Sequence, residues 1–219
     1  MSKKEILNKT KAYIRKKMEG EGTGHDWWHI YRVWQTAKKI GREERANMFV
    51  VELSALLHDI ADHKFHGGDD TAGPKVARGW MEKIEVDPKS VDHVCDIIAN
   101  MSFNKTFDKH QIFSSAELRV VQDADRLDAI GAIGIARAFA YGGHKQRKLY
   151  DPAEKPMKYK SGEEYRKNNV GHTVNHFYEK LLLIKDRMNT KTGKRLARAR
   201  HKFMERYLSK FFEEWKGER

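Results

Sequence analysis

Two histidines and two aspartates, each set in an apolar helical pattern, are the residues of this chain best suited to chemistry: His29, His58, Asp59 and Asp125. Imidazole nitrogens and carboxylate oxygens are ligands that borderline and hard divalent cations accept, and no thiolate is among them. A cation held by this set in octahedral coordination keeps room for a water and a substrate oxygen. The residue types therefore favour metal-assisted hydrolysis of a phosphate ester or anhydride.

Taken singly, each of these residues has an ordinary structural explanation. A histidine on an amphipathic helix is more often a satisfied structural residue, and an aspartate near a helix end often caps the next element. Their surroundings change this balance. His58 and Asp59 form the polar end of an otherwise apolar helix, and Asp125 stands between two apolar stretches, VV at 120–121 and LDAI at 127–130. Because unpaired polar groups are costly to bury, carboxylates in such places need a cation or several donors.

The composition favours a helical protein with an anionic partner. The chain has 219 residues, enough for one well-buried core, and only 4 of them are proline. Its net charge of +12 favours a nucleotide, a polyphosphate or a nucleic acid as partner, without indicating which. The single cysteine, Cys95, cannot form an internal disulfide, and no apolar run suits a signal peptide or a membrane span. We expect a cytoplasmic protein that does not enter a membrane.

Apolar residues recur at helical spacing along most of the chain, which predicts an all-α fold. Asp26 follows a glycine-rich break and is placed to cap the next helix. Gly131 and Gly134 lie inside a long expected helix, where they would permit close helix–helix contact. The expected helices cover Lys4–Met18, Trp27–Ile40, Ala46–Ile60, Pro74–Ile84, a stretch that starts at Asp87-Pro88, Ser115–Tyr141, Glu163–Met188 and Lys191–Trp215. We expect a single domain over 1–219, with a core at 20–141, a basic loop at 142–162 and a C-terminal helical pair at 163–217.

Three segments carry a family resemblance: GHDWWHIYRV at 24–33, LSALLHDIADHKFH at 53–66 and VVQDADRLDAIGAIGIAR at 120–137. Their order, H…HD…D, resembles the HD-domain superfamily of metal-dependent phosphohydrolases, and the match covers the first two-thirds of the chain. The later segment NHFYEKLLLIKDRMNTKTG, at 175–193, is similar to the C-terminal region of a small bacterial subgroup. At least some members of that subgroup release pyrophosphate from nucleoside triphosphates. A motif of several parts in helical context is far more specific than a short pattern.

The resemblance implies that His29, His58, Asp59 and Asp125 coordinate the metal. Asp123 competes with Asp125 for the last position, which we assign to Asp125 because the family's final ligand lies in an Ala-Asp-Arg-Leu context. Asp128 is a third choice. Mn or Mg is preferred for phosphate chemistry, while Fe, Co, Ni and Zn also fit the ligand types.

Three further residues are candidates for catalysis. Asp62 lies four residues after His58, where other superfamily members commonly have a glutamate that orients or deprotonates the attacking water. The alternative for Asp62 is a loop residue bonded to backbone amides. For His25 and Lys64 we favour contact with phosphate, because they flank the ligands in chain order. His66, in the same region, is assigned a structural role.

Two basic segments and a histidine pair allow less specific interpretations. The basic loop at 142–162, which we read as a functional flap or an extended loop, could neutralise a triphosphate tail as a group. His172 and His176 are four residues apart, a spacing that can bind metal, although one ligand set is already assigned. The run KTGKRLARARHK at 191–202 is read as a solvated helix face, with nucleic-acid contact as the alternative.

The expected function is metal-dependent hydrolysis of a small phosphorylated molecule, with nucleoside triphosphate pyrophosphohydrolysis preferred. Removal of phosphate from nucleoside monophosphates is the near alternative. The alternative from another class is a non-catalytic nucleotide- or nucleic-acid-binding module that keeps the metal site for structure or sensing. The expected partner is a nucleotide, and the oligomeric state stays open, with a homo-oligomer as one outcome.

Overall fold

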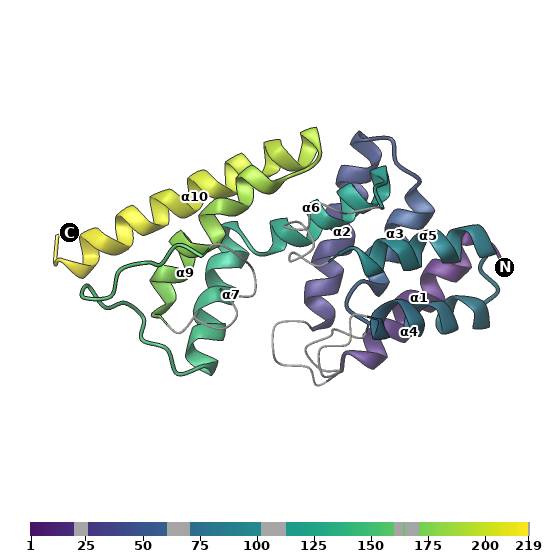
Figure 1. The fold of residues 1–219 in the computed structure, drawn as a ribbon, viewed down its shortest axis with the longest axis horizontal. Helices are drawn as coiled ribbons and strands as arrows, with labels where there is room; N and C mark the ends of the chain where they lie inside the picture. The colour runs from purple at the N-terminus through teal and green to yellow at the C-terminus, as the bar shows by residue number, and fades with distance from the viewer. Residues whose placement is uncertain (20–25, 61–70, 102–112, 160–163, 165–170, 219) are drawn as a thin grey trace. The chain divides into compact units, whose positions relative to one another are not determined.

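A computed structural model describes residues 1–19, 26–60, 71–101, 113–159, 164 and 171–218. Within these ranges all regular secondary structure is helical, which confirms the all-α prediction (Figure 1). The chain forms two compact units, Met1–Ala124 and Asp125–Arg219. The boundary between them falls inside one continuous helix, α6, which runs from Ala116 to Asp128. No helix among the described residues is long and apolar enough to cross a bilayer.

The first unit contains the helix that carries His29 and the helix that ends at the His58-Asp59 doublet. Its described helices are α1 (Lys3–Lys17), α2 (Trp27–Glu43), α3 (Met48–Leu57), α4 (Ala72–Lys83) and α5 (Pro88–Ala99), followed by the first part of α6. Helix α3 packs against α2, α5 and α1, and α4 packs against α5. The central place of α3 follows from its sequence, because a helix that is apolar on nearly every side must be buried on nearly every side.

Polar caps fix where the helices of this unit begin. Asn47 caps α3 through a bond from the Phe49 amide, and Asp26 caps α2 as expected. The expected helix over 46–60 is shorter in the structure, because 58–60 form a turn after α3. That turn carries His58 and Asp59.

The second unit contains α7 (Gly131–His144), α9 (Thr173–Glu179), the 3₁₀ helix η3 (Leu181–Arg187) and α10 (Lys191–Trp215). Helix α10 packs against α7 and η3, and α9 contacts η3 and α7. The two ends of α10, Lys191 and Trp215, agree with the prediction. Thr190 caps it through a bond from the Gly193 amide.

The single helix expected over 115–141 is wrong, because the chain breaks between α6 and α7. Ile130 is extended and Gly131 has a φ of 80°, a left-handed conformation that side chains disfavour. A Cβ on Gly134 would lie 2.2 Å from the carbonyl oxygen of Ala129, so the absent side chain makes room for the turn. The two glycines therefore serve a turn between helices rather than contact along one helix.

The helix expected over 163–188 is also wrong in its described part. The short helix α9 ends at Glu179, and Lys180, with φ −141° and ψ −57°, leads into the 3₁₀ helix η3. The loop expected over 142–162 starts later in the structure, because α7 continues to His144, and its described part after that helix, 145–159, is tied to α9. The Thr173 and Val174 amides donate to the Lys148 and Leu149 carbonyls at 3.0 and 3.2 Å.

Candidate metal centre

His29 is delivered by the first turn of α2. The Asp26 carboxylate accepts a hydrogen bond from the His29 amide at 2.8 Å, which fixes the start of the helix and the direction of this turn. The His29 side chain is buried, with 2% of its surface exposed. A buried imidazole needs polar partners, and its ring nitrogen Nε2 faces two other candidate ligands.

His58 lies at the C-terminal end of α3, where its ring orientation is set by the backbone. Its Nδ1 lies 2.9 Å from the carbonyl oxygen of Ala55, and a carbonyl can only accept, so Nδ1 carries the proton. In the neutral ring Nε2 then holds a lone pair. This arrangement, one ring nitrogen bonded to a carbonyl and the other free to coordinate, is the one that metal-ligating histidines commonly show.

Asp59 completes a close group of three. Its Oδ2 lies 3.3 Å from Nε2 of His29 and 3.5 Å from Nε2 of His58, and the two Nε2 atoms are 3.4 Å apart. Two ligands held about 2.1 Å from one ion lie about 3.0 Å apart at a right angle and about 3.4 Å apart at the tetrahedral angle. The three donor atoms are therefore spaced as ligands of one common cation are.

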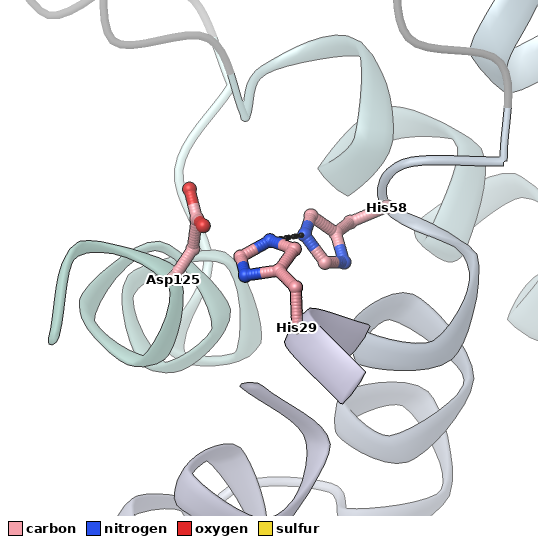
Figure 2. Close-up of side chains that lie close together, drawn as sticks. All are labelled: His29, His58 and Asp125. Atoms are coloured by element: carbon pink, nitrogen blue, oxygen red, sulfur yellow. Dashed lines mark hydrogen bonds between the residues drawn. The ribbon is translucent and has the colours of Figure 1, made fainter. Parts of the chain in front are cut away.

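Asp125 reaches the same group from α6. Its carboxylate and the ring nitrogens of His29 and His58 all lie within 4.8 Å of one another, and Figure 2 shows the three side chains pointing together. Asp125 directly follows Ala124 in the same helix, so α6 itself places the carboxylate. Each of the two aspartates singled out as ligands therefore approaches both imidazoles, Asp59 through its Oδ2 and Asp125 within the 4.8 Å group.

The competing aspartates of α6 lie elsewhere. Asp128 is buried and forms an ion pair with Arg137, whose Nη1 is 2.6 Å from its Oδ2. Asp123 is fully buried and is not part of the group around the two histidines. Of the three aspartates weighed, Asp125 is the one that faces both imidazoles.

Two arginines that no sequence pattern singles out donate to the end of α6. Arg200, on α10, donates to the Leu127 carbonyl, and Arg137 donates to the Asp128 carbonyl at 3.4 Å as well as to its carboxylate. The last carbonyls of a helix have no partner inside the helix, so these bonds satisfy groups that would otherwise be unpaired. Burial lowers the pKa of Arg200, and Asp128 opposes that shift. These residues are distant from Asp125 in sequence, and no local pattern identifies them.

The three residues assigned to catalysis, Asp62, Lys64 and His25, lie outside the described residues, as does His66. Their roles stay predictions.

The histidine pair of the second unit does not form a second metal site in the described residues. His172 caps α9: its Nδ1 accepts from the Asn175 amide at 3.1 Å, and its Nε2 lies 3.3 Å from the Glu154 carbonyl. Both ring nitrogens are therefore engaged. The pKa of His176 is lowered to about 3, chiefly by burial and secondarily by Lys180 and Arg147.

The basic loop lines a cavity of about 470 Å³ in the second unit. One of its cations, Lys148, is already paired, with Asp151 at 2.6 Å and Glu154 at 3.3 Å. Lys145 and Arg147 both lie 5.8 Å from the Tyr141 ring centre. Together with the backbone bonds to α9, these contacts describe an anchored loop rather than an unattached flap.

Comparisons with known proteins identify the family of this chain. Residues 27–130 match the family described as HD domain. The uncharacterized protein YpgQ of Bacillus subtilis (strain 168) is 38% identical over 200 residues, which cover 90% of this chain and 88% of YpgQ. The crystal structure of an HD-superfamily hydrolase from Bacillus thuringiensis has 41% identity and a TM-score of 0.79, covering 98% of this chain and 99% of that one.

A crystal structure of Bacillus subtilis YpgQ in complex with ADP is similar over 98% of this chain and 97% of that chain, with a TM-score of 0.76 and 33% identity in that alignment. The region that matches the HD-domain family, 27–130, contains His29, His58, Asp59 and Asp125. The resemblance seen in the motifs is confirmed by these relatives. The chain belongs to the HD-domain superfamily of hydrolases.

Proposed function

We propose that this protein is a metal-dependent phosphohydrolase of nucleotides, with nucleoside triphosphate pyrophosphohydrolysis as its preferred reaction. The observation that carries the proposal is the convergence of His29, His58, Asp59 and Asp125. The ADP complex of YpgQ supports a nucleotide as the ligand class. Two neutral imidazoles and two carboxylates suit a divalent cation, because the carboxylates offset its charge.

A divalent cation in this site, preferably Mn or Mg, would polarise a phosphoryl oxygen and make a water more acidic. The protein residues have separate tasks. His29, His58, Asp59 and Asp125 hold the ion, and the Ala55 carbonyl keeps the His58 ring in the ligating tautomer. Burial of both histidines limits water around the donor atoms and strengthens their interaction with charge.

Residues next to the ligands in sequence are proposed to handle the substrate. Asp62 would accept a proton from the attacking water, since it follows the His58-Asp59 doublet closely in the chain. Lys64 and His25 would contact phosphate oxygens and offset the charge of the leaving group. Testing Asp62→Asn separately from Lys64→Gln would distinguish loss of turnover from loss of substrate affinity.

The test is a product screen over ribo- and deoxynucleoside tri-, di- and monophosphates with several divalent cations. We expect pyrophosphate and a nucleoside monophosphate from triphosphates, and no turnover by Asp59→Ala at unchanged helical circular dichroism. Asp92→Ala, which removes an exposed carboxylate from α5, is the matched control and should keep full activity. Orthophosphate from monophosphates alone would favour the phosphatase alternative. Equal hydrolysis by Asp59→Ala and the control, in metal-free buffer, would contradict the proposal.

A further inference from the structure

Helix α10 carries a row of exposed basic residues that the proposed reaction does not use. We name as the α10 stripe the residues Lys191, Lys194, Arg195, Arg198, Lys202 and Arg206, all exposed. Residues 191–204 contain no aspartate or glutamate, and the one acidic residue within the span of the stripe, Glu205, lies 3.2 Å from Nε2 of His201. The helix is unbroken from Lys191 to Trp215, so the spacing of the row is set by helix geometry (Figure 1).

That geometry puts the six cations of the stripe on one side of the helix. At about 100° and about 1.5 Å per residue, they fall within an arc of about 120° and extend over about 22 Å. Another side of α10 is buried through Ala197, Met204 and Leu208, which fixes the helix in its unit. The stripe is therefore a rigid, linear array of positive charge facing solvent.

Helix α1 shows that this clustering does not follow from basic composition alone. It also has six exposed cations, namely Lys3, Lys4, Lys9, Arg15, Lys16 and Lys17. The same rotation of about 100° per residue spreads them around the whole circumference of α1. The α10 stripe and α1 therefore match in their number of exposed cations and differ in how those cations are arranged.

The charge of the stripe is largely uncompensated. Within the described ranges, no ion pair neutralises Lys194, Arg198 or Lys202. Arg206 lies over the ring of Phe203, 5.9 Å from its centre, and that ring is 41% exposed. Beyond the stripe the pattern changes, because Lys210 pairs with Glu213 and Glu214 at 3.6 and 3.7 Å.

We propose that the α10 stripe binds the phosphate backbone of double-stranded nucleic acid without reading sequence. A linear array over about 22 Å suits a polymer that carries one charge per about 1.7 Å of its axis, rather than a single nucleotide. A lipid surface fits less well, because a helix that lies on a bilayer needs a free apolar face and the apolar face of α10 is buried. This inference does not depend on the hydrolase activity.

The experiment measures binding of the full chain to a fluorescein-labelled 20-base-pair duplex by anisotropy, over a range of KCl concentrations. The stripe variant is Lys194→Gln, Arg198→Gln, Lys202→Gln and Arg206→Gln combined. The control variant is Lys4→Gln, Lys9→Gln, Arg15→Gln and Lys16→Gln on α1, which removes the same charge. Both are checked for unchanged helicity and melting temperature.

The wild-type affinity should fall with salt, and four phosphate contacts predict a log–log slope of about −3.6 from this surface. The stripe variant should lose that part of the slope and bind at least tenfold more weakly, while the control variant stays within about twofold of wild type. Equal losses in the two variants would overturn the proposal, because binding would then reflect net charge alone. Tighter stripe-dependent binding to vesicles of anionic lipid than to the duplex would also overturn it. Nucleotide hydrolysis, measured in parallel, should be unchanged in both variants, so failure of this proposal is distinguishable from failure of the proposed function.

Discussion

His58 donates its Nδ1 hydrogen to the carbonyl oxygen of Ala55, one turn earlier in α3, at 2.9 Å. This bond determines which ring nitrogen can bind a cation, and that nitrogen, Nε2, faces His29 at 3.4 Å and Asp59 at 3.5 Å. The end of an apolar helix thus supplies both a ligand and the backbone acceptor that orients it. The bond connects the burial of α3 to the chemistry of the site.

Adding Mn²⁺ should stabilise the folded protein through this site. A ligand that binds only the folded state adds about 2.7 kcal/mol at a concentration one hundred times its Kd. We expect the melting temperature to rise with Mn²⁺ and to return to its starting value with EDTA. In His58→Ala the rise should be lost. An equal rise in that variant would place the cation elsewhere.

Arg200→Met should weaken metal binding although Arg200 is no ligand. The substitution leaves the Leu127 carbonyl at the end of α6 without its arginine donor and loosens the helix that carries Asp125. Loss of such a part-buried bond costs about 1 kcal/mol or more. Isothermal titration of the metal-free protein should show several-fold weaker Mn²⁺ binding, with partial recovery in Arg200→Lys.

Arg198→Met, an exposed neighbour on the same helix, is the matched control for Arg200→Met and should bind Mn²⁺ as wild type does. Equal Mn²⁺ affinity in Arg200→Met and this control would show that Arg200 does not help to position Asp125.

Gly142→Ala and Gly143→Ala, adjacent in α7, should have opposite effects on stability. A Cβ on Gly142 would lie 2.2 Å from Oγ1 of Thr173, whereas a Cβ on Gly143 meets nothing within 4 Å. We expect the first substitution to destabilise by about 1–3 kcal/mol through overpacking. The second should stabilise by up to about 1 kcal/mol through helix propensity. Urea unfolding measures both, and changes of the same sign would contradict the packing of α7 on α9.

His176→Asn should reduce the loss of stability on acidification. Burial lowers the pKa of His176 from 6.5 to about 3, so the folded state keeps this ring neutral while the unfolded chain takes up a proton below pH 6.5. The free energy of unfolding therefore falls as the pH drops from about 6.5 towards about 3. Between pH 7 and 5 this single group contributes a fall of up to about 2 kcal/mol.

The measurement is urea unfolding of metal-free protein at pH 7 and pH 5. His176→Asn should show a smaller difference between the two pH values than wild type, whereas His144→Asn, which changes an exposed histidine, should not. Identical pH dependence in wild type and His176→Asn would contradict the neutral state of the His176 ring in the folded protein.

Most helix positions could be predicted from the sequence because they depend on local patterns, and the order of the motifs led to residues that lie near one another in the structure. Apolar spacing and caps located α2 and α10, and the order of His29, the His58-Asp59 doublet and Asp125 located the site. The break at Gly131 was not predictable in this way, since its neighbours are alanine and isoleucine at helical spacing. A long-range contact favours glycine at this position, because a Cβ on Gly131 would lie 3.0 Å from the Arg200 side chain.

The change from α9 to η3 also has no local signal. Residues 173–187 contain neither glycine nor proline, so propensity alone predicts one continuous helix. Packing against α7 and α10 sets the break instead. The same limit applies to Arg137 and Arg200: Arg200 reaches Leu127 from a segment distant in sequence, and Arg137 reaches Asp128 only because the chain breaks between α6 and α7.

Whether the four side chains hold one cation is tested by the metal content of the protein after dialysis with Mn²⁺. Mass spectrometry measures this content in wild type and in four variants: His29→Ala, His58→Ala, Asp59→Ala and Asp125→Ala. We expect about one ion per wild-type chain and a marked loss in each of the four variants, because all four side chains are proposed to share one cation. Full metal content in the four variants, with helicity preserved, would contradict this proposal.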